Sequence, residues 1–145
     1  MTKRFLFSII LATGLSSGTM GFALATADMR NEIILQRTLS WNGIPYRAYP
    51  SGTPELTVKR MTIPPHSALP WHRHSAPNAA YVLSGHLIVE DRATGLAQTY
   101  RAGQAFAESV DDVHRGRTDN EEAVVIVTYA GVPGMPLSIP EGEPK

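Results

Sequence analysis

The chain has 145 residues, with 13 basic and 13 acidic side chains, a formal net charge of zero and 43% hydrophobic residues. This length suits one domain with a core of its own. A charged share of only 18% argues against disorder. Without a basic excess, the chain lacks the feature that nucleic-acid binding requires, so no nucleic-acid partner is expected. Cysteine is absent, so a metal site would need nitrogen and oxygen ligands.

The first 25 residues have the pattern of a secretory signal peptide. Lys3 and Arg4 precede the apolar run from Phe5 to Leu15, and small residues end at Ala25. We predict a signal peptide over 1–25, with cleavage after Ala25 or Ala27. The apolar run is short for the ~20 residues of a membrane span, which favours cleavage over an uncleaved anchor. The expected location is the periplasm or the extracellular medium, without membrane association after cleavage.

The next predicted feature is a β-hairpin. Glu32–Trp41 and Ile44–Tyr49 flank Asn42-Gly43, a pair that accepts the positive φ angles of a type I′ turn. The flanking segments are therefore predicted to be strands.

Short apolar runs separated by turn residues follow at close spacing. The predicted strands are Leu56–Ile63, Trp71–His74, Asn78–Leu83, Leu87–Asp91, Ala97–Tyr100, Gln104–Ala107, Val113–Arg117 and Ala123–Tyr129. No long window after Arg30 shows a helical period, so the pattern predicts a β-sandwich or barrel over 26–131. The proline-rich segment 132–145 is expected to be an extended tail along the surface or a neighbour.

Two histidines on one strand suggest a metal site. His72 and His74 are two residues apart, so in a strand both side chains lie on the same face. Neutral imidazole is the commonest protein metal ligand. His114 lies on another predicted strand, which antiparallel structure can bring into contact. His66 and His86 fall in predicted turns and are expected to be exposed.

The surrounding sequence resembles the cupin superfamily. His72-x-His74 followed by Asn78 and Gly85 is similar to the first cupin motif, G(X)5HxH(X)3-4E(X)6G. Gly103, Asp111 and His114 are similar to the second, G(X)5PxG(X)2H(X)3N. The resemblance implies an all-β fold, a single-domain jelly-roll β-barrel. It also implies a divalent metal held by His72, His74 and His114.

Several motif positions differ from that pattern. Asn78 stands where the family has its glutamate, so a neutral amide replaces a carboxylate. It could ligate as a fourth group but could not act as a general base. His66 and Asp111 replace glycines, Ser109 replaces proline and Thr118 replaces asparagine. Those turns are therefore expected to be built differently.

The expected cofactor is one divalent transition metal ion: zinc, copper, iron, nickel or manganese. Imidazole-rich coordination favours zinc, copper or iron over magnesium and calcium. By strand parity, Ala80 and Val82 share the inward face with Asn78, so the space near the metal should be narrow and apolar. Glu108 is a candidate acid or base, but the irregular segment from Ser109 to Asp112 leaves its direction unreadable.

Three functions remain open at this point. The favoured one is a non-catalytic periplasmic protein that binds a metal or a small molecule, because Asn78 lacks charge and no general base is evident. The alternative is a metal-dependent enzyme, oxygenase-like or isomerase-like, acting on a small organic molecule. The third is an interaction domain whose histidines no longer bind metal. The resemblance also implies a homodimer.

Overall fold

The computed structural model describes residues 29–142, so the signal peptide predicted over 1–25 lies outside the described residues. Contacts divide the chain into two units, Met1–Asn31 and Glu32–Lys145, and the fold below is that of the second. Between residues 29 and 142 every regular element is a strand. Within that same range, no helix has the length and apolar character needed to cross a bilayer.

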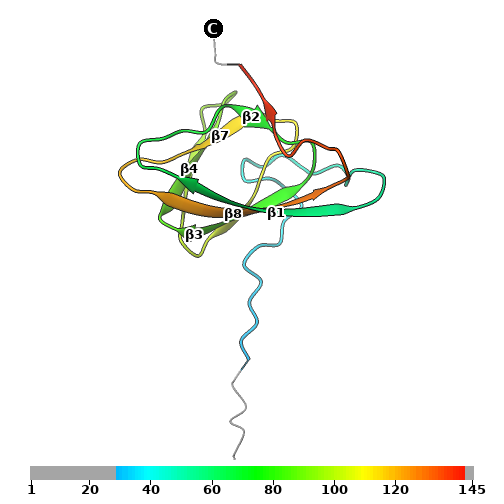
Figure 1. Ribbon diagram of the computed structural model, residues 1–145, viewed down its shortest axis with the longest axis horizontal. Coiled ribbons are helices and arrows are strands. Elements are labelled where there is room, and N and C mark those ends of the chain that lie inside the picture. Colours follow the sequence, from blue (N-terminus) through cyan, green and yellow to red (C-terminus); the bar gives the residue numbers. More distant parts are fainter. Residues whose placement is uncertain (1–28, 143–145) are drawn as a thin grey trace, which may run out of the picture. The chain divides into compact units, whose positions relative to one another are not determined.

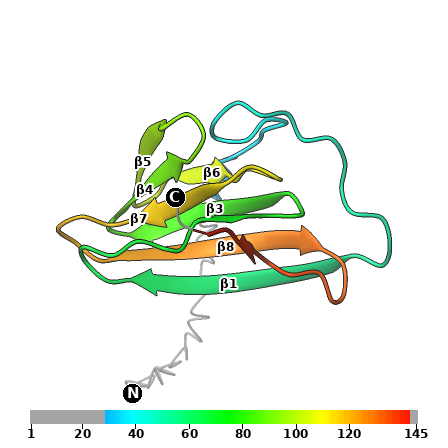
Figure 2. The same cartoon turned by 90° about the horizontal axis from the view of Figure 1, so that it is seen from above.

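Nine strands form two antiparallel sheets (Figures 1 and 2). They are β1 (Glu55–Ile63), β2 (His72–Arg73), β3 (Asn78–Ser84), β4 (His86–Asp91), β5 (Ala97–Arg101), β6 (Ala105–Ala107), β7 (His114–Arg117), β8 (Ala123–Gly131) and β9 (Ile139–Pro140). One sheet has the order β1-β8-β3-β6 and the other β5-β4-β7-β2-β9. The fold is therefore all-β, as predicted. Its strand pairing gives two sheets rather than one closed barrel.

Strand β8 is the centre of the first sheet. Its β-branched sequence suits a pleated surface, and it pairs with β1 from Glu55↔Gly131 to Ile63↔Ala123. Val125 and Val127 are fully buried, whereas Thr128 is exposed. The two sheets pack their inner faces together, because valines of β8 and of β4 belong to the same apolar core.

Strand β2 is short, and it brings the two histidine segments together. His72 lies opposite His114 of β7, and β9 pairs along the other side of β2. Prolines at 70 and 77 flank this segment, and proline cannot donate a ladder hydrogen bond. β2 is only two residues long, and His72 and the neighbouring His74 both line the cavity between the sheets.

The predicted strands from Leu56 to Tyr129 are confirmed within a residue or two, except that β2 is shorter than the predicted Trp71–His74. The strands predicted at Glu32–Trp41 and Ile44–Tyr49 do not form at that length, but a short antiparallel pairing joins the two segments. Leu39 bridges Pro45, the Ser40 N–H donates to the Ile44 carbonyl at 2.9 Å, and the Tyr46 N–H donates to the Thr38 carbonyl at 3.0 Å. The turn is present, but Gly43 alone has a positive φ, 87°. A type I′ turn needs positive φ at both central residues, so the turn is of another type.

Two of the motif positions that depart from the family pattern have glycine-like backbone angles. His66 and Asp111 stand where the family pattern has glycine, and both adopt positive φ angles, 54° and 58°. The backbone keeps a conformation that glycine adopts freely and other residues rarely do. His66 and Asp111 therefore adopt this conformation at the cost of backbone strain that glycine would not have.

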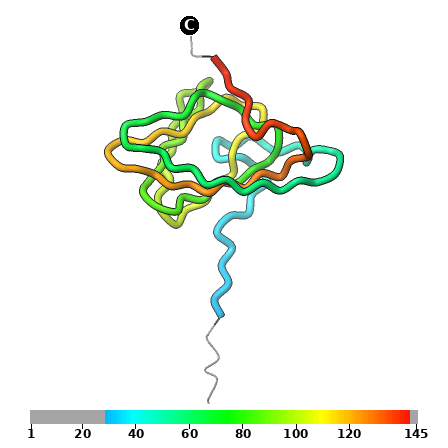
Figure 3. The backbone as a smooth tube through the Cα atoms, in the orientation of Figure 1, coloured from blue at the N-terminus to red at the C-terminus, as the bar shows by residue number. Residues whose placement is uncertain are grey.

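The proline-rich tail takes part in the second sheet. Ile139 and Pro140 pair with β2, and the Glu141 N–H donates to the Trp71 carbonyl at 2.8 Å. Figure 3 follows this segment, in red, back beside the second sheet. The sequence indicated an extended segment but not this strand.

Candidate metal centre

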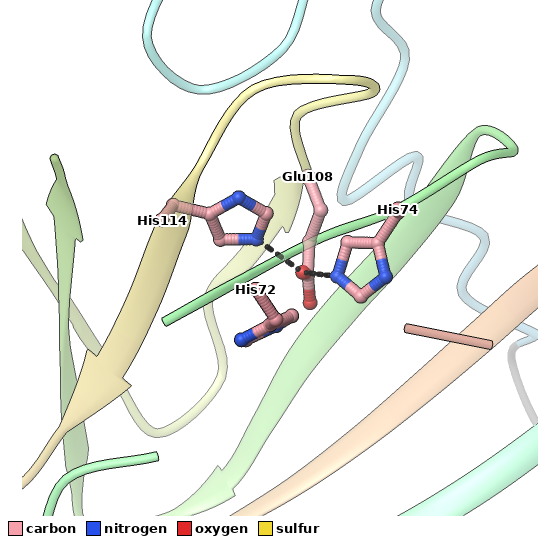
Figure 4. Close-up of side chains that lie close together, drawn as sticks. All are labelled: His72, His74, Glu108 and His114. Carbon is pink, nitrogen blue, oxygen red and sulfur yellow. Dashed lines mark hydrogen bonds and ion pairs between the residues drawn. The ribbon is translucent and has the colours of Figure 1, made fainter. Parts of the chain in front are cut away.

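Three imidazole rings, those of His72, His74 and His114, gather around one carboxylate group (Figure 4). Their ring centroids are 4.9 Å apart for His72 and His74, 4.8 Å for His72 and His114, and 5.1 Å for His74 and His114. His74 and His114 are each 2% exposed. The structure thus brings together the three histidines that the sequence singled out.

A carboxylate completes the group, and it comes from Glu108. Its Oε2 lies 2.6 Å from His74 Nε2 and 3.1 Å from His114 Nε2. One ligand atom from each of His72, His74, Glu108 and His114 lies within 4.8 Å of the others. Two donors that bind one ion at ~2.1 Å stand about 3 Å apart, so these spacings fit a shared metal.

Strand parity explains why Glu108 points inward. It follows β6, where Phe106 faces the core, so two residues later the side chain returns to the same side. The backbone N–H of Glu108 donates to the Asn78 carbonyl at 3.1 Å, and the Tyr46 hydroxyl donates to the backbone carbonyl of Glu108 at 2.5 Å. Counting from Phe106 rather than from the irregular turn after it would have found this residue in the sequence.

Each imidazole holds its Nδ1 against a backbone carbonyl oxygen. The distances are 2.8 Å from His72 to Pro70, 2.6 Å from His74 to Leu137 and 3.0 Å from His114 to Asp112. A carbonyl only accepts, so each Nδ1 carries a proton and each Nε2 is left with its lone pair in the neutral ring. Backbone partners of this kind fix the tautomer of metal-binding histidines.

The carboxylate and the rings shift each other's proton affinity. Burial alone would raise the pKa of Glu108, but hydrogen bonds from His114 and His74 hold that pKa far below its usual range. Burial opposes protonation of His114, but the Glu108 carboxylate raises the pKa of that ring. Burial lowers the pKa of His72. Neutral Nε2 atoms and a carboxylate all carry lone pairs, so their close approach requires a proton or a metal cation between them.

Asn78 is buried next to this group without joining it. It is 5% exposed, and neither polar atom of its side chain has a hydrogen-bond partner within residues 29–142. Its backbone carbonyl is occupied by Glu108. A role for Asn78 as a metal ligand remains a prediction.

A cavity of about 200 Å³ opens onto the histidine and glutamate side chains. Its walls include Met61, Leu87 and Phe106, so it is mostly apolar, as expected. Ala80 and Val82 point inward but belong to the core rather than to this cavity. Tyr129 also lines it, and burial together with the charge of Glu108 raises the pKa of that phenol, which stays protonated at neutral pH.

The N-terminal loop braces the segment that carries Glu108 and His114. The Asn42 amide donates to the Asp112 carboxylate at 2.6 Å and accepts from the Ser109 hydroxyl at 2.9 Å. Sequence reasoning missed this contact, because it joins residues nearly 70 positions apart.

The two remaining histidines lie outside the cluster. His66 is exposed, as expected. His86 is partly buried, contrary to expectation, because its two ring nitrogens contact Asp119 at 2.7 Å and Glu121. Neither belongs to the group that could hold a metal.

Comparison with known proteins identifies the fold. Residues 59–129 match the family model described as the Cupin domain. No curated protein sequence matches the chain.

Three solved structures illustrate the structural similarity. The polyketide cyclase RemF from Streptomyces resistomycificus superimposes with a TM-score of 0.53 at 16% identity, covering 62% of this chain and 63% of that one. The DMSP lyase DddQ from Ruegeria pomeroyi gives 0.53 at 20% identity, covering 61% and 45%. A cupin-like protein from Thermotoga maritima gives 0.52 at 17% identity, covering 60% and 65%. The chain spans less than two thirds of each, and identities this low establish the fold alone.

Proposed function

Because the chain belongs to the cupin superfamily, with its Cupin domain at residues 59–129, we propose that it binds one divalent transition metal ion. The ligands are His72, His74, Glu108 and His114. The donor set of three imidazoles and one carboxylate suits zinc, copper, iron, nickel or manganese. Asn78 is a further proposed ligand, and its unpartnered amide leaves an oxygen free for that role.

The observation that carries this proposal is the set of three Nδ1 contacts with backbone carbonyls. They leave Nε2 as the lone-pair atom in each ring, and two of these atoms converge on one buried carboxylate oxygen. A bound cation satisfies all these acceptors at once, whereas protons must charge the rings in a buried site.

The cavity supports a second part of the proposal, a small organic ligand beside the metal. When bound, the ion would act as a Lewis acid that holds and polarises an oxygen atom of that ligand. We further propose that the two sheets act as one jelly-roll barrel, that the protein works in the periplasm as a homodimer, and that binding is its main function.

Elemental analysis of protein purified from its native compartment tests the metal assignment. We expect close to one equivalent of a transition metal, and its loss in His74→Ala and His114→Ala. His66→Ala is the matched control, because His66 lies outside the cluster and should leave the metal content unchanged. Less than about a tenth of an equivalent in the wild type would instead favour a domain whose histidines no longer bind metal.

Metal-dependent catalysis is a second candidate function, and Glu108 favours it. The sequence argued against catalysis because Asn78 removed a carboxylate, but Glu108 supplies one at the same cluster. Two of the structurally similar proteins are described as a cyclase and a lyase. Metal-loaded protein that consumes oxygen or turns over a panel of small acids and phenols would establish an enzyme. Saturable binding without turnover would establish a binder.

A further inference from the structure

A single cation stands at the edge of the cavity. Lys59 lines it from the edge strand β1, on the same face as Met61, and its side chain is exposed. Within residues 29–142 it has no ion-pair partner, whereas Arg73 pairs with Glu141 at 2.8 Å and Arg115 pairs with Glu90 at 2.9 Å. The ammonium group is therefore available to a ligand.

A hydroxyl group lies next to it on the same sheet face. Lys59 pairs with Val127, so Tyr129 is its diagonal neighbour across the β1–β8 ladder. Diagonal neighbours have Cα atoms about 7–8 Å apart, within reach of a long side chain. The Tyr129 ring lies 5.7 Å from the His74 ring, and its hydroxyl makes no hydrogen bond to any residue from 29 to 142. Lys59, Tyr129 and His74 thus form a row of neighbouring side chains that ends at the cluster.

The remaining chemistry of the cavity selects against other ligands. Glu108 is the one carboxylate among the residues that line the cavity, and its Oε2 already contacts the Nε2 atoms of His74 and His114. The walls are otherwise largely apolar, with Leu69 and Val125 among them. A cation and a hydroxyl donor beside largely apolar walls fit an anionic head on an apolar body, whereas a cationic ligand would find no free carboxylate among the lining residues.

We propose that the cavity binds a short organic carboxylate whose head is held jointly by the Lys59 ammonium and the Tyr129 hydroxyl, with its apolar body against the cavity wall. The proposal builds on the proposed function, because the ligand lies beside the metal site. The two donors, however, belong to the protein itself and do not require the ion.

Isothermal titration with benzoate and hexanoate tests this, with benzamide and hexanamide as neutral counterparts. Each is titrated into zinc-loaded and into metal-free protein. We expect wild type to bind the acids about tenfold more tightly than the amides, and Lys59→Met to lose most of that preference at unchanged zinc content. Tyr129→Phe should weaken acid binding about fivefold, the size of one hydrogen bond.

Arg60→Met is the matched control, because Arg60 is the next residue on β1 and points to the opposite face. Lys59→Gln repeats the charge removal with a polar side chain in case the methionine variant folds poorly. Equal binding of acids and amides by wild type, no binding of either acid, or wild-type acid binding by both Lys59 variants would each overturn the proposal. Lys59-dependent acid binding by a protein that takes up none of zinc, copper, iron, nickel and manganese would support it while refuting the proposed metal function.

Discussion

The two ends of the space between the sheets are built by opposite rules. At one end, Val82, Ala123 and Val127 form an apolar core that follows directly from strand alternation. At the other, His74, His114 and Glu108 are buried just as deeply but depend on partners from elsewhere in the chain. Buried apolar groups gain stability by packing alone, whereas buried polar groups cost free energy until each acceptor and donor is satisfied. The polar end is therefore the part that a ligand can complete.

Glu108→Gln should have the largest effect, because it changes the polar end directly. The change keeps the shape of the side chain but removes the charge that faces two rings, so metal affinity should fall by a factor on the order of 100. Competition with a chromogenic chelator measures it. Glu122→Gln, at an exposed position, is the control and should bind as wild type does. Equal affinity for both variants would mean that Glu108 is no ligand.

Val82→Ala probes the apolar end. Val82 is fully buried and lies outside the residues that line the cavity, so the space left behind should cost about 2 kcal/mol of unfolding free energy, with metal affinity changed less than twofold. Urea unfolding of the metal-free protein measures the loss. The same substitution at Val58, which is 66% exposed, should cost less than about 0.5 kcal/mol. A large loss of metal affinity in Val82→Ala would show that the two ends are coupled.

The stability of the metal-free protein should depend on pH through the groups of the polar end, and this effect is expected to be smaller. The pKa of Glu108 is lowered on folding, so its contribution is present above the unfolded value of 4.5 and is lost as pH falls through the folded value. The pKa of His114 is raised, so its contribution is present below 6.5 and is lost as pH rises through the folded value.

Glu108 and His114 together should therefore stabilise the metal-free protein most between about pH 4.5 and pH 6.5, and the lowered pKa of His72 moves the maximum toward the upper end of that window. The Tm of the metal-free protein should fall toward pH 8.5, while the stabilisation by added zinc increases, because zinc replaces protons on the rings. Thermal unfolding with and without zinc measures both trends. A Tm of metal-free protein that rises steadily to pH 8.5 would contradict the assigned ion pair.

The smallest predicted effect concerns the loops. Asp111 has a φ of 58°, so Asp111→Gly should relieve backbone strain and stabilise the protein by about 0.5–1 kcal/mol. Its ion pair with Arg73, at 3.3 Å on an exposed side chain, offsets little of that gain. Ala93→Gly, in another exposed turn, lacks positive φ and should destabilise by a similar amount. Changes in unfolding free energy of opposite sign for the two variants, each measured relative to wild type, would confirm that the φ angle decides the effect.

Most strands were predictable because apolar, β-branched composition and bounding turn residues are local properties. Residues 123 to 129 form a run of apolar and β-branched side chains, and β8 covers that run. The hairpin around Asn42-Gly43 is shorter than predicted, because its backbone pairing extends only over residues 38 to 46. The Asn42 side chain binds distant groups as well, which the local pattern does not reveal.

The sequence by itself determined the all-β class and the facing pair His72 and His74, and it singled out His114 as a third candidate ligand. The tertiary structure alone decided that Glu108 supplies the carboxylate, that Leu137 of the tail orients His74, and that Lys59 lines the cavity. The reason is physical: strand parity fixes a side chain's face within one strand. Partners for buried polar atoms, in contrast, come from whichever distant segment the packing brings near.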